Sequence, residues 1–276
     1  MVQRIYRFRD GKELTIGGRT LVMGILNVTP DSFSDGGKWN TRDMALRHME
    51  EMVWDGADII DIGAESSRPG FVPMGAEEEM ERLLPFLEAV LSECPVPVSV
   101  DTFKAETARA ALRAGAHMLN DIWGMQYAEE PGAMARVAAE ADVPVVVMHN
   151  QNGTVYDGDI IREMRAFFIR SLAIADAAGL SREKIILDPG IGFGKTAEQN
   201  MHVLRRMDEL ISYDGVDYPV LLGASRKSFI GAALDLPVTE RMEATGAVCV
   251  MGIERGASIV RVHDVKPIAR MCRMTD

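Results

Sequence analysis

Short runs of apolar residues recur along the chain, each followed by a longer segment in which apolar residues return at helical spacing. The run at residues 21–26, LVMGIL, is apolar throughout, which indicates a strand buried on both faces. Strands are predicted at residues 21–26, 57–62, 96–101, 117–121, 143–148, 184–188, 218–222 and 257–263. Helices are predicted over residues 41–55, 77–93, 104–114, 131–142, 159–178, 196–211, 239–255 and from 265 to the end.

This alternation of strands and helices favours a parallel sheet, because parallel neighbours need a crossover connection. Eight strand–helix units in about 250 residues favour closure into a (β/α)8 TIM barrel, an α/β fold, over an open sheet. We therefore expect a single domain over residues 1–276, with residues 1–20 as an N-terminal extension and residues 21–276 as the barrel. No low-complexity segment or block of like charge interrupts the chain to mark a linker.

Residues 4–16 alternate in character around an Asp-Gly pair at 10–11, a pattern typical of a β-hairpin. We expect this hairpin to cover one end of the core with four apolar side chains, Ile5, Phe8, Leu14 and Ile16. In the first predicted helix, Thr41 is expected to cap the N-terminus and Gly56 to end the helix.

The chain of 276 residues is 47% hydrophobic and carries a formal net charge of −11. This charge opposes binding to nucleic acid or an anionic membrane, but it leaves open an anionic small molecule held by local arginines and lysines. The three cysteines, Cys94, Cys249 and Cys272, are far apart and form no CxxC pair, which argues against a disulfide framework or zinc site and fits a reducing cytoplasm. The N-terminus lacks the apolar region of a secretory signal, and no apolar run reaches the roughly 18 residues of a membrane span.

Polar residues fall at or just past the C-terminal ends of the predicted strands. They are Asn27, Asp61, Asp101, Asn120, His149, Asp188, Lys227 and His263. In a β/α barrel these ends meet at one mouth, where the chemistry of such folds is done. Two long loops rich in Gly, Pro and Ser, residues 28–40 and 63–75, follow the first two strands. Loops of that length are usually functional, and they can close over a bound complex and exclude water.

Asp101, Asn120 and Asp188 end three separate strands at this mouth. Together they suit recognition of a planar heterocycle by its edge, because a carboxylate accepts hydrogen bonds from an adjacent ring N–H and exocyclic NH2 as it does from an arginine. The alternative for each residue alone is a helix cap or a loop hydrogen bond. Three such residues at one mouth favour the binding role.

A second, basic set occupies the same strand ends: Arg68, Arg226, Lys227, Arg261 and His263. Cations gathered there in so acidic a chain indicate a site for phosphate or another polyanion. The alternative is solvation at the surface or pairing with nearby aspartates. That alternative weighs most for Arg226, which stands beside Lys227.

Asn27 is neutral, and it suits a magnesium ion that keeps most of its waters and takes its other ligands from substrate phosphates. His149 is assigned no role, because a lone histidine at a strand end is more often a structural residue. The GxGxG run at residues 190–194 has the wrong spacing for dinucleotide binding.

Seven segments of the chain resemble, in order, motifs of the dihydropteroate synthase family, the pterin-binding barrels of folate biosynthesis. They read GILNVTPDSFSDGG at 24–37, SSRPG at 66–70, VDTFK at 100–104, NDI at 120–122, LDPGIGF at 187–193, SRKS at 225–228 and RVHDV at 261–265. The resemblance implies a transferase that condenses 6-hydroxymethyl-7,8-dihydropterin diphosphate with 4-aminobenzoate to 7,8-dihydropteroate and diphosphate. It also implies Mg2+ as cofactor and a cytoplasmic homodimer.

The resemblance assigns the site residues motif by motif. Asp101, Asn120, Asp188 and Lys227 would hold the pterin, with Phe193 packed beside it. Asn27, Arg68, Arg261 and His263 would hold the diphosphate, with the metal ion at Asn27. Phe33, Ser67, Pro69 and Lys227 would line the aminobenzoate pocket. Asp101, Lys227, Arg68, Arg261 and His263 would carry the catalytic step.

These assignments support a dissociative reaction. The cations and magnesium stabilise the diphosphate as it leaves, and Asp101 stabilises the cation-like pterin methylene. The aniline nitrogen of aminobenzoate then attacks, so no protein nucleophile is needed. Two positions depart from the family pattern: Ser67 stands where many relatives carry threonine, and the segment after His149 is one of several variants.

Three rival classes of protein would share part of this pattern. A methyltetrahydrofolate–corrinoid methyltransferase would share the pterin carboxylates but would not need the SRP and SRK motifs at 67–69 and 225–227. A metal-dependent hydrolase barrel would need an HxH pair on the first strand, which the segment GILN lacks. A non-catalytic pterin-binding paralogue should have lost loop residues first, yet both loops look complete.

Overall fold

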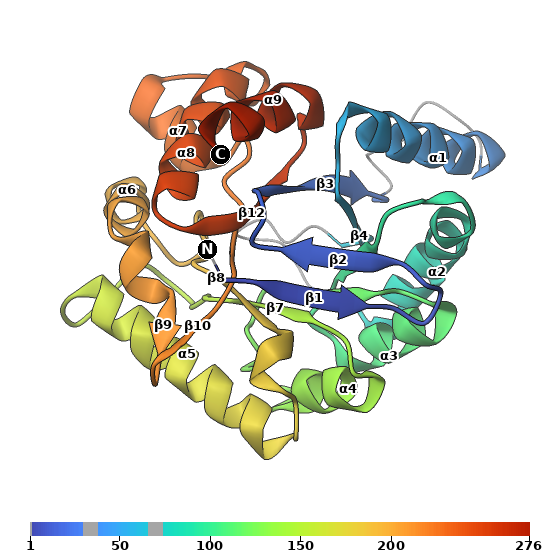
Figure 1. Ribbon diagram of the computed structural model, residues 1–276, viewed down its shortest axis with the longest axis horizontal. Helices are drawn as coiled ribbons and strands as arrows, with labels where there is room; N and C mark the ends of the chain where they lie inside the picture. Colours follow the sequence, from blue (N-terminus) through green and yellow to red (C-terminus); the bar gives the residue numbers. More distant parts are fainter. Residues whose placement is uncertain (1, 30–37, 66–73) are drawn as a thin grey trace.

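The computed structural model describes residues 2–29, 38–65 and 74–276, without the side chains of residues 38–41. In this part of the chain, eight parallel strands close into a barrel in the order β11-β12-β3-β4-β5-β6-β7-β8. Helices surround the strands as a ring (Figure 1). The predicted α/β barrel with an N-terminal hairpin is confirmed.

The barrel strands lie close to the predicted runs. They are β3 (Leu21–Asn27), β4 (Ile59–Gly63), β5 (Val98–Asp101), β6 (Met118–Asp121), β7 (Val145–Met148), β8 (Ile185–Asp188), β11 (Val220–Leu222) and β12 (Ala257–Val262). The helices are α1 (Lys38–Asp55), α2 (Ala76–Glu93), α3 (Ala105–Ala114), α4 (Ala133–Ala141), α5 (Ile160–Ala177), α6 (Ala197–Arg205), α7 (Ser228–Leu234), α8 (Met242–Glu254) and α9 (Val265–Thr275). None of these helices has the length and apolar composition needed to cross a membrane.

The strands are buried on both faces because alternate side chains enter two different cores. Met23 of β3 and Ile59 of β4 are register partners, and both pack inside the barrel. Val22 of β3 instead packs outward against the surrounding helices. A Cβ at Gly24 would lie only 2.8 Å from Met52 Sδ, so α1 packs directly on the strand there. Alternation between two apolar environments explains why the strands appear in the sequence as continuous apolar runs.

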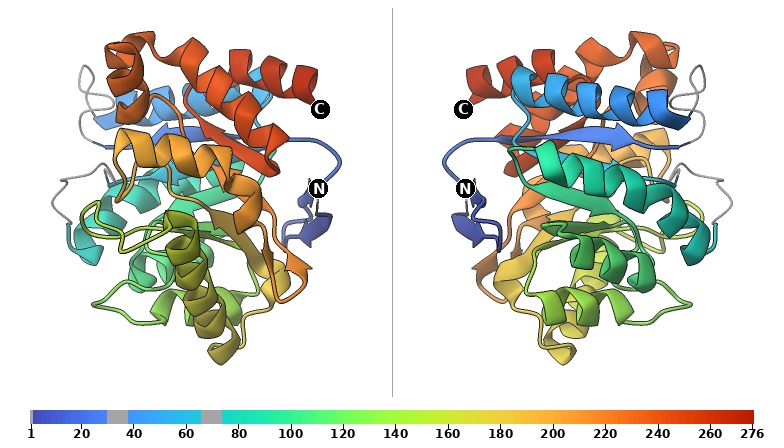
Figure 2. Two further views of the ribbon diagram at one scale, coloured as in Figure 1. Left: turned by 90° about the vertical axis from the view of Figure 1, so that its left-hand side faces the viewer. Right: turned by 90° about the vertical axis from the view of Figure 1, so that its right-hand side faces the viewer.

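The hairpin of β1 (Arg4–Arg7) and β2 (Glu13–Ile16) closes the end of the barrel where the strands begin, and β3 points away from it (Figure 2). Leu14 and Ile16 are buried in the interior cluster as predicted, and Phe8 packs against it. The prediction for Ile5 is wrong, because its side chain is 53% exposed. The pleat of β1 points Tyr6 inward instead, and its hydroxyl donates to Glu183 O at 2.8 Å.

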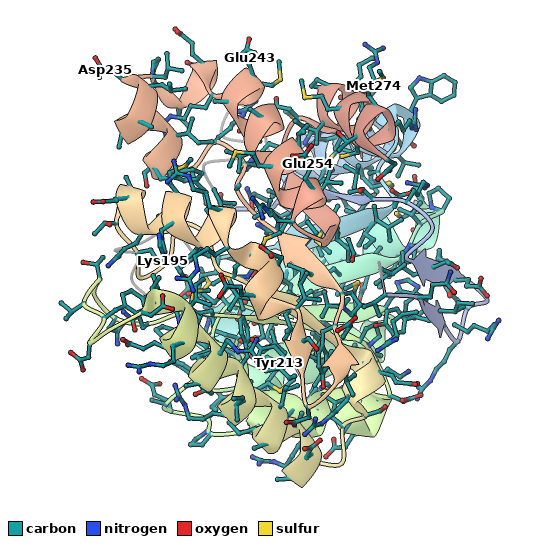
Figure 3. The ribbon with its side chains drawn as sticks, turned by 60° about the vertical axis from the view of Figure 1, so that its left-hand side comes forward. Lys195, Tyr213, Asp235, Glu243, Glu254 and Met274 are labelled. Carbon is teal, nitrogen blue, oxygen red and sulfur yellow. The ribbon has the colours of Figure 1, made fainter. Side chains whose placement is uncertain are left out.

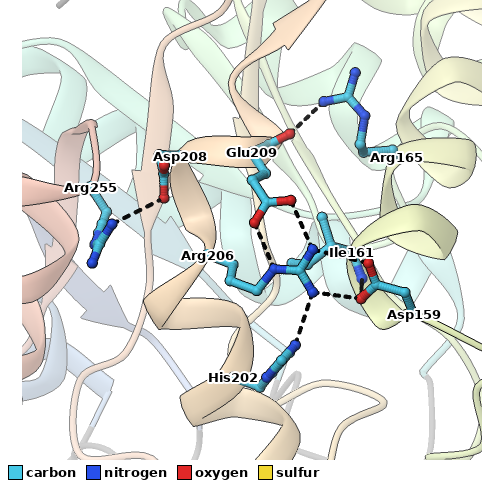
Figure 4. A network of polar contacts seen from close by, with 8 residues as sticks. All are labelled: Asp159, Ile161, Arg165, His202, Arg206, Asp208, Glu209 and Arg255. Atoms are coloured by element: carbon cyan, nitrogen blue, oxygen red, sulfur yellow. Dashed lines mark hydrogen bonds and ion pairs between the residues drawn. The ribbon is translucent and has the colours of Figure 1, made fainter.

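Several element boundaries differ from prediction. α1 begins at Lys38, so the predicted cap at Thr41 is wrong, whereas Gly56 does end the helix with φ +108°. The helix predicted over 196–211 stops at Arg205, and a short 3-10 helix, η3 (Met207–Leu210), follows. Arg206 leaves helical geometry with φ −119°, and its guanidinium binds Asp159, the N-cap of α5, and Glu209 (Figure 4).

Candidate active site

Arg261 on β12 lies between two carboxylates from neighbouring strands. Its Nε donates to Asp61 Oδ2 on β4 at 2.6 Å, and its Nη2 donates to Asp101 Oδ2 on β5 at 2.7 Å. Asn120 on β6 donates from Nδ2 to the same Asp61 oxygen at 3.1 Å. The structure therefore brings together three of the predicted site residues and adds a fourth, Asp61, whose side chain is completely buried.

Two carboxyl groups share one guanidinium on this side of the mouth. Burial raises the pKa of the Asp101 carboxyl; Arg261 opposes that shift and Asp61 adds to it. Burial alone would lower the pKa of the Arg261 guanidinium, but Asp61 and Asp101 outweigh it and raise the pKa above its ordinary value. Arg261 therefore keeps its positive charge, whereas burial disfavours the charged form of Asp101.

A second group forms where β8 and β11 end. Asp188 Oδ1 accepts from the backbone N–H of Gly190 at 2.7 Å. A Cβ at Gly223 would lie 3.7 Å from Asp188 Oδ2 and 3.9 Å from Lys227 Nζ, so the two charged groups lie close to the same point. Lys227 also donates to Ile191 O, and its Nζ lies 4.5 Å from the centre of the Phe193 ring.

Burial lowers the pKa of Lys227 to about 8; Asp188 opposes this shift, and Arg261 adds to it. Burial also raises the pKa of Asp188, with Lys227 opposing. The two groups therefore stabilise each other's charged forms. The structure thus brings together three of the residues predicted to hold the pterin, Asp188, Lys227 and Phe193. The charges of Arg261 and Asp101 also act on the pKa of Lys227.

His263, which follows β12, is oriented by Ser225. Ser225 Oγ accepts from the backbone N–H of His263 at 3.2 Å and lies 3.0 Å from its Nδ1. Arg226 instead pairs with an aspartate: its Nε donates to Asp264 Oδ2 at 2.8 Å, and its Nη2 donates to Asp264 Oδ1.

Asn27 ends β3, is half-buried, and pairs in register with Gly63 of β4. Its amide offers one neutral oxygen at the mouth, which fits a Mg2+ ion that keeps its waters and takes phosphate oxygens. Among the described residues, no three His, Cys, Asp or Glu side chains gather as a metal site. Phe33, Ser67, Arg68 and Pro69 lie outside the described residues, so their assignments stay predictions.

Sequence reasoning gave no role to Asp61 or to the buried lysine that follows β5, Lys104. Lys104 is 5% exposed, and its Nζ binds Glu65 Oε2 at 2.5 Å and Glu79 Oε2 at 3.1 Å. Glu65 in turn accepts from the backbone N–H of Met74 at 2.7 Å. The sequence does show Asp61 as a charged residue inside an apolar strand and Lys104 as a charged residue just after one. It does not show which residues these two side chains contact.

Polar side chains at the C-terminal mouth of a closed parallel barrel define the site of a β/α-barrel enzyme. Comparison with known proteins narrows this class. The model of the family described as pterin binding enzyme matches residues 23–263. The chain is 53% identical to the dihydropteroate synthase of Bacillus subtilis over 258 residues, which is 94% of this chain and 88% of the relative.

Two solved structures are also similar over nearly the whole chain. One is a dihydropteroate synthase from Clostridium difficile in the presence of pteroic acid, with a TM-score of 0.90, 49% identity and coverage of 95% and 97% of the two chains. The other is a dihydropteroate synthase from Xanthomonas albilineans with 4-aminobenzoic acid, with a TM-score of 0.88, 38% identity and coverage of 96% and 94%. The chain belongs to the dihydropteroate synthase family of pterin-binding enzymes.

Proposed function

We propose that this chain condenses 6-hydroxymethyl-7,8-dihydropterin diphosphate with 4-aminobenzoate, forming 7,8-dihydropteroate and releasing diphosphate. The observation that carries the proposal is the arrangement of Arg261 between Asp61 and Asp101, beside Asn120. This arrangement places hydrogen-bond acceptors and donors for a flat heterocycle at one mouth. The same mouth contains a cation that can bind the leaving group of the heterocycle. The pteroic acid and 4-aminobenzoic acid of the two similar structures support this choice of substrates.

The pterin ring would lie between the two groups of the mouth. Asp101 and Asp188 would accept from its N–H donors, and Asn120 and Lys227 would donate to its acceptors. Phe193, which already lies under Lys227 Nζ, would pack on the ring. Since Asp101 and Asp188 are buried with pKa values raised by desolvation, a ligand that donates hydrogen bonds to their charged forms relieves that cost.

The diphosphate would lie nearer the strand that carries Arg261. Arg261 and His263, with Arg68 from outside the described residues, would donate to its oxygens. A Mg2+ ion held there by Asn27 would supply positive charge to the leaving group. The Arg261 guanidinium keeps its positive charge, and Ser225 holds the His263 ring in place through two contacts.

The reaction breaks the bond between the pterin methylene carbon and the diphosphate oxygen, and that bonding pair leaves with the diphosphate. The methylene carbon becomes cation-like, and the negative charge of Asp101 and Asp61 stabilises it. The lone pair of the aminobenzoate nitrogen forms the new C–N bond, and one N–H proton is released. Lys227 would line the aminobenzoate side with Phe33, Ser67 and Pro69.

From the family resemblance we also propose the domain organisation, oligomeric state and cellular location of the protein. The chain would form one domain over residues 1–276 and act as a homodimer in the cytoplasm, without nucleic-acid or membrane partners. The three free cysteines, all buried, support a reducing compartment.

The test is a chromatographic assay of purified protein with magnesium, the dihydropterin diphosphate and labelled 4-aminobenzoate. Magnesium-dependent formation of labelled dihydropteroate is the expected result. Absence of product, with binding of a pterin still measurable, would overturn the proposal in favour of a pterin-binding paralogue or a methyltransferase. A matched reaction without the dihydropterin diphosphate controls for modification of aminobenzoate alone.

A further inference from the structure

The turn between β8 and α6 contains a buried lysine that the reaction above does not use. Lys195, marked beside α6 in Figure 3, is 8% exposed. Its Nζ lies 3.0 Å from each of three acceptors: His149 Nδ1, Gly190 O and Phe193 O. Each of its three N–H groups therefore has a partner.

Through these acceptors, Lys195 connects the turn to His149 in the loop after β7 and also links two residues within the turn. Gly190 O and Phe193 O stand at the two ends of the short segment that contacts Lys227. Inside this segment, Ile191 O accepts from Lys227, and the Phe193 ring faces Lys227 Nζ. The Lys195 ammonium thus fixes the shape of the segment that holds Lys227.

The packing around this turn leaves little room for another shape. A Cβ on Gly190, which has φ +64°, would lie 2.0 Å from His149 O. A Cβ on Gly192 would lie 2.7 Å from Lys227 Cδ. The turn packs against the loop after β7 on one side and against Lys227 on the other. A displacement of the turn at the loop would therefore also displace it at Lys227.

A lysine is a costly choice for this position. Burial lowers the pKa of Lys195 to about 7; Asp188 opposes that shift and Lys227 adds to it. Burial, followed by the Lys195 charge, also lowers the pKa of His149, so the imidazole is neutral and all three hydrogen-bond partners of the ammonium are neutral. An apolar side chain of similar volume would fill the space without this desolvation cost, so packing alone does not explain the residue.

We propose that Lys195 is a positioning residue for the pterin site: its ammonium, bound to His149, fixes the turn of residues 190–193 and thereby places Lys227 and the Phe193 ring. His149 then acts as a neutral acceptor that holds the lysine. The choice of a pterin as the ligand rests on the proposed function.

The first experiment is calorimetric titration with 6-hydroxymethylpterin, using wild type, Lys195→Met and Lys184→Met. Lys184 lies at the opposite end of β8, where its Nζ donates to Asp142 O at 2.7 Å, so it is a matched control for loss of a lysine. We expect Lys195→Met to raise the Kd roughly tenfold or more and Lys184→Met to leave it within about twofold. Equal affinities for Lys195→Met and wild type would overturn the proposal.

A second pair of variants keeps the test open if Lys195→Met does not fold. His149→Asn places an amide oxygen near the position of Nδ1 and retains an acceptor, whereas His149→Leu removes it. We expect His149→Asn to keep the wild-type Kd and His149→Leu to raise it. An equal Kd for the two variants would count against the role of the Lys195–His149 contact.

A spectroscopic measurement separates positioning from general stability. Nitrogen-15 NMR of labelled wild type should show His149 neutral, with Nδ1 unprotonated, because Lys195 donates to that atom. In Lys195→Met the preference should be lost. Protonated Nδ1 in wild type would overturn the proposal. An inactive wild type that still binds pterin with the Lys195 effect would refute the proposed function and leave this inference standing.

Discussion

Asp101 accepts from Arg261 through one oxygen, and 11% of its side chain remains exposed. Replacing it by asparagine substitutes an amide NH2 for a carboxylate oxygen, so a ring N–H of the pterin would meet a donor where it needs an acceptor. We expect Asp101→Asn to weaken binding of 6-hydroxymethylpterin by roughly tenfold to a hundredfold. Calorimetric titration measures this, and Asp208→Asn, in an exposed pair with Arg255, is the control. Unchanged affinity of Asp101→Asn would remove Asp101 from the pterin site.

The charge of Lys227 predicts a pH limit on activity. Burial lowers the pKa of its ammonium to about 8, so the charged form is present below that pH and is lost above it. We expect kcat/KM for the dihydropterin diphosphate to fall above about pH 8, approaching tenfold per pH unit. Lys227→Arg stays charged over the whole range, so above pH 8 its kcat/KM should fall less steeply than that of wild type, and loss of the Lys195 charge, whose pKa burial lowers to about 7, is common to both proteins. The same fall in both proteins would contradict the assignment to Lys227.

For single residues, the sequence was sufficient where the position along the chain indicates the role. Asp101, Asn120, Asp188 and Lys227 each end or follow a buried strand, and the barrel then brings such ends together. Asp61 was not assigned, because its role is set by Arg261, 200 residues away. Lys195 depends in the same way on His149, which packing places beside it.

Among the elements, those with a long apolar pattern were predictable and the short ones were not. All eight barrel strands were found, since two apolar environments leave a clear run in the sequence. α7 was missed because seven residues hold too few turns for a helical period to appear. The hairpin of β9 (Ser212–Tyr213) and β10 (Val216–Asp217) was missed because its strands have two residues each. The end of α6 was misplaced because Arg206 pairs with a distant residue, Asp159.

The turn between β8 and α6 makes an element-scale prediction about stability. Gly190→Ala would place a Cβ 2.0 Å from His149 O at φ +64°, so backbone must move. Gly153, at φ +77° with no atom within 4 Å of a Cβ, is the control that carries the same left-handed penalty of about 1–2 kcal/mol without a clash. We expect Gly190→Ala to lose at least about 2 kcal/mol more free energy of unfolding than Gly153→Ala. Urea denaturation followed by circular dichroism checks this, and equal losses would refute the close packing of the turn.

In the whole molecule, the proposed active site and the stabilising N-terminal hairpin lie at opposite ends of the barrel. The proposed site residues stand where the strands end, and the hairpin closes the end where they begin. The barrel itself followed from the count of strand–helix units, because closure needs no information beyond repetition and length. Which hairpin face is buried was predicted only in part, since a four-residue strand offers two possible faces and Tyr6 carries a polar hydroxyl.

This separation predicts that stability and activity respond differently to changes in the hairpin. Ile16 is completely buried against the barrel interior, so Ile16→Ala should lower the free energy of unfolding by about 2–5 kcal/mol through lost apolar burial and a cavity. Ile5, 53% exposed on the same hairpin, is the matched control, and Ile5→Ala should change it by less than about 0.5 kcal/mol. Well below the unfolding temperature, both variants should keep the wild-type kcat, because neither touches the strand ends that carry the site. Thermal unfolding and steady-state kinetics on the three proteins measure these effects. A loss of kcat in folded Ile16→Ala would show that the hairpin is coupled to the mouth, and equal stability losses would refute its buried face.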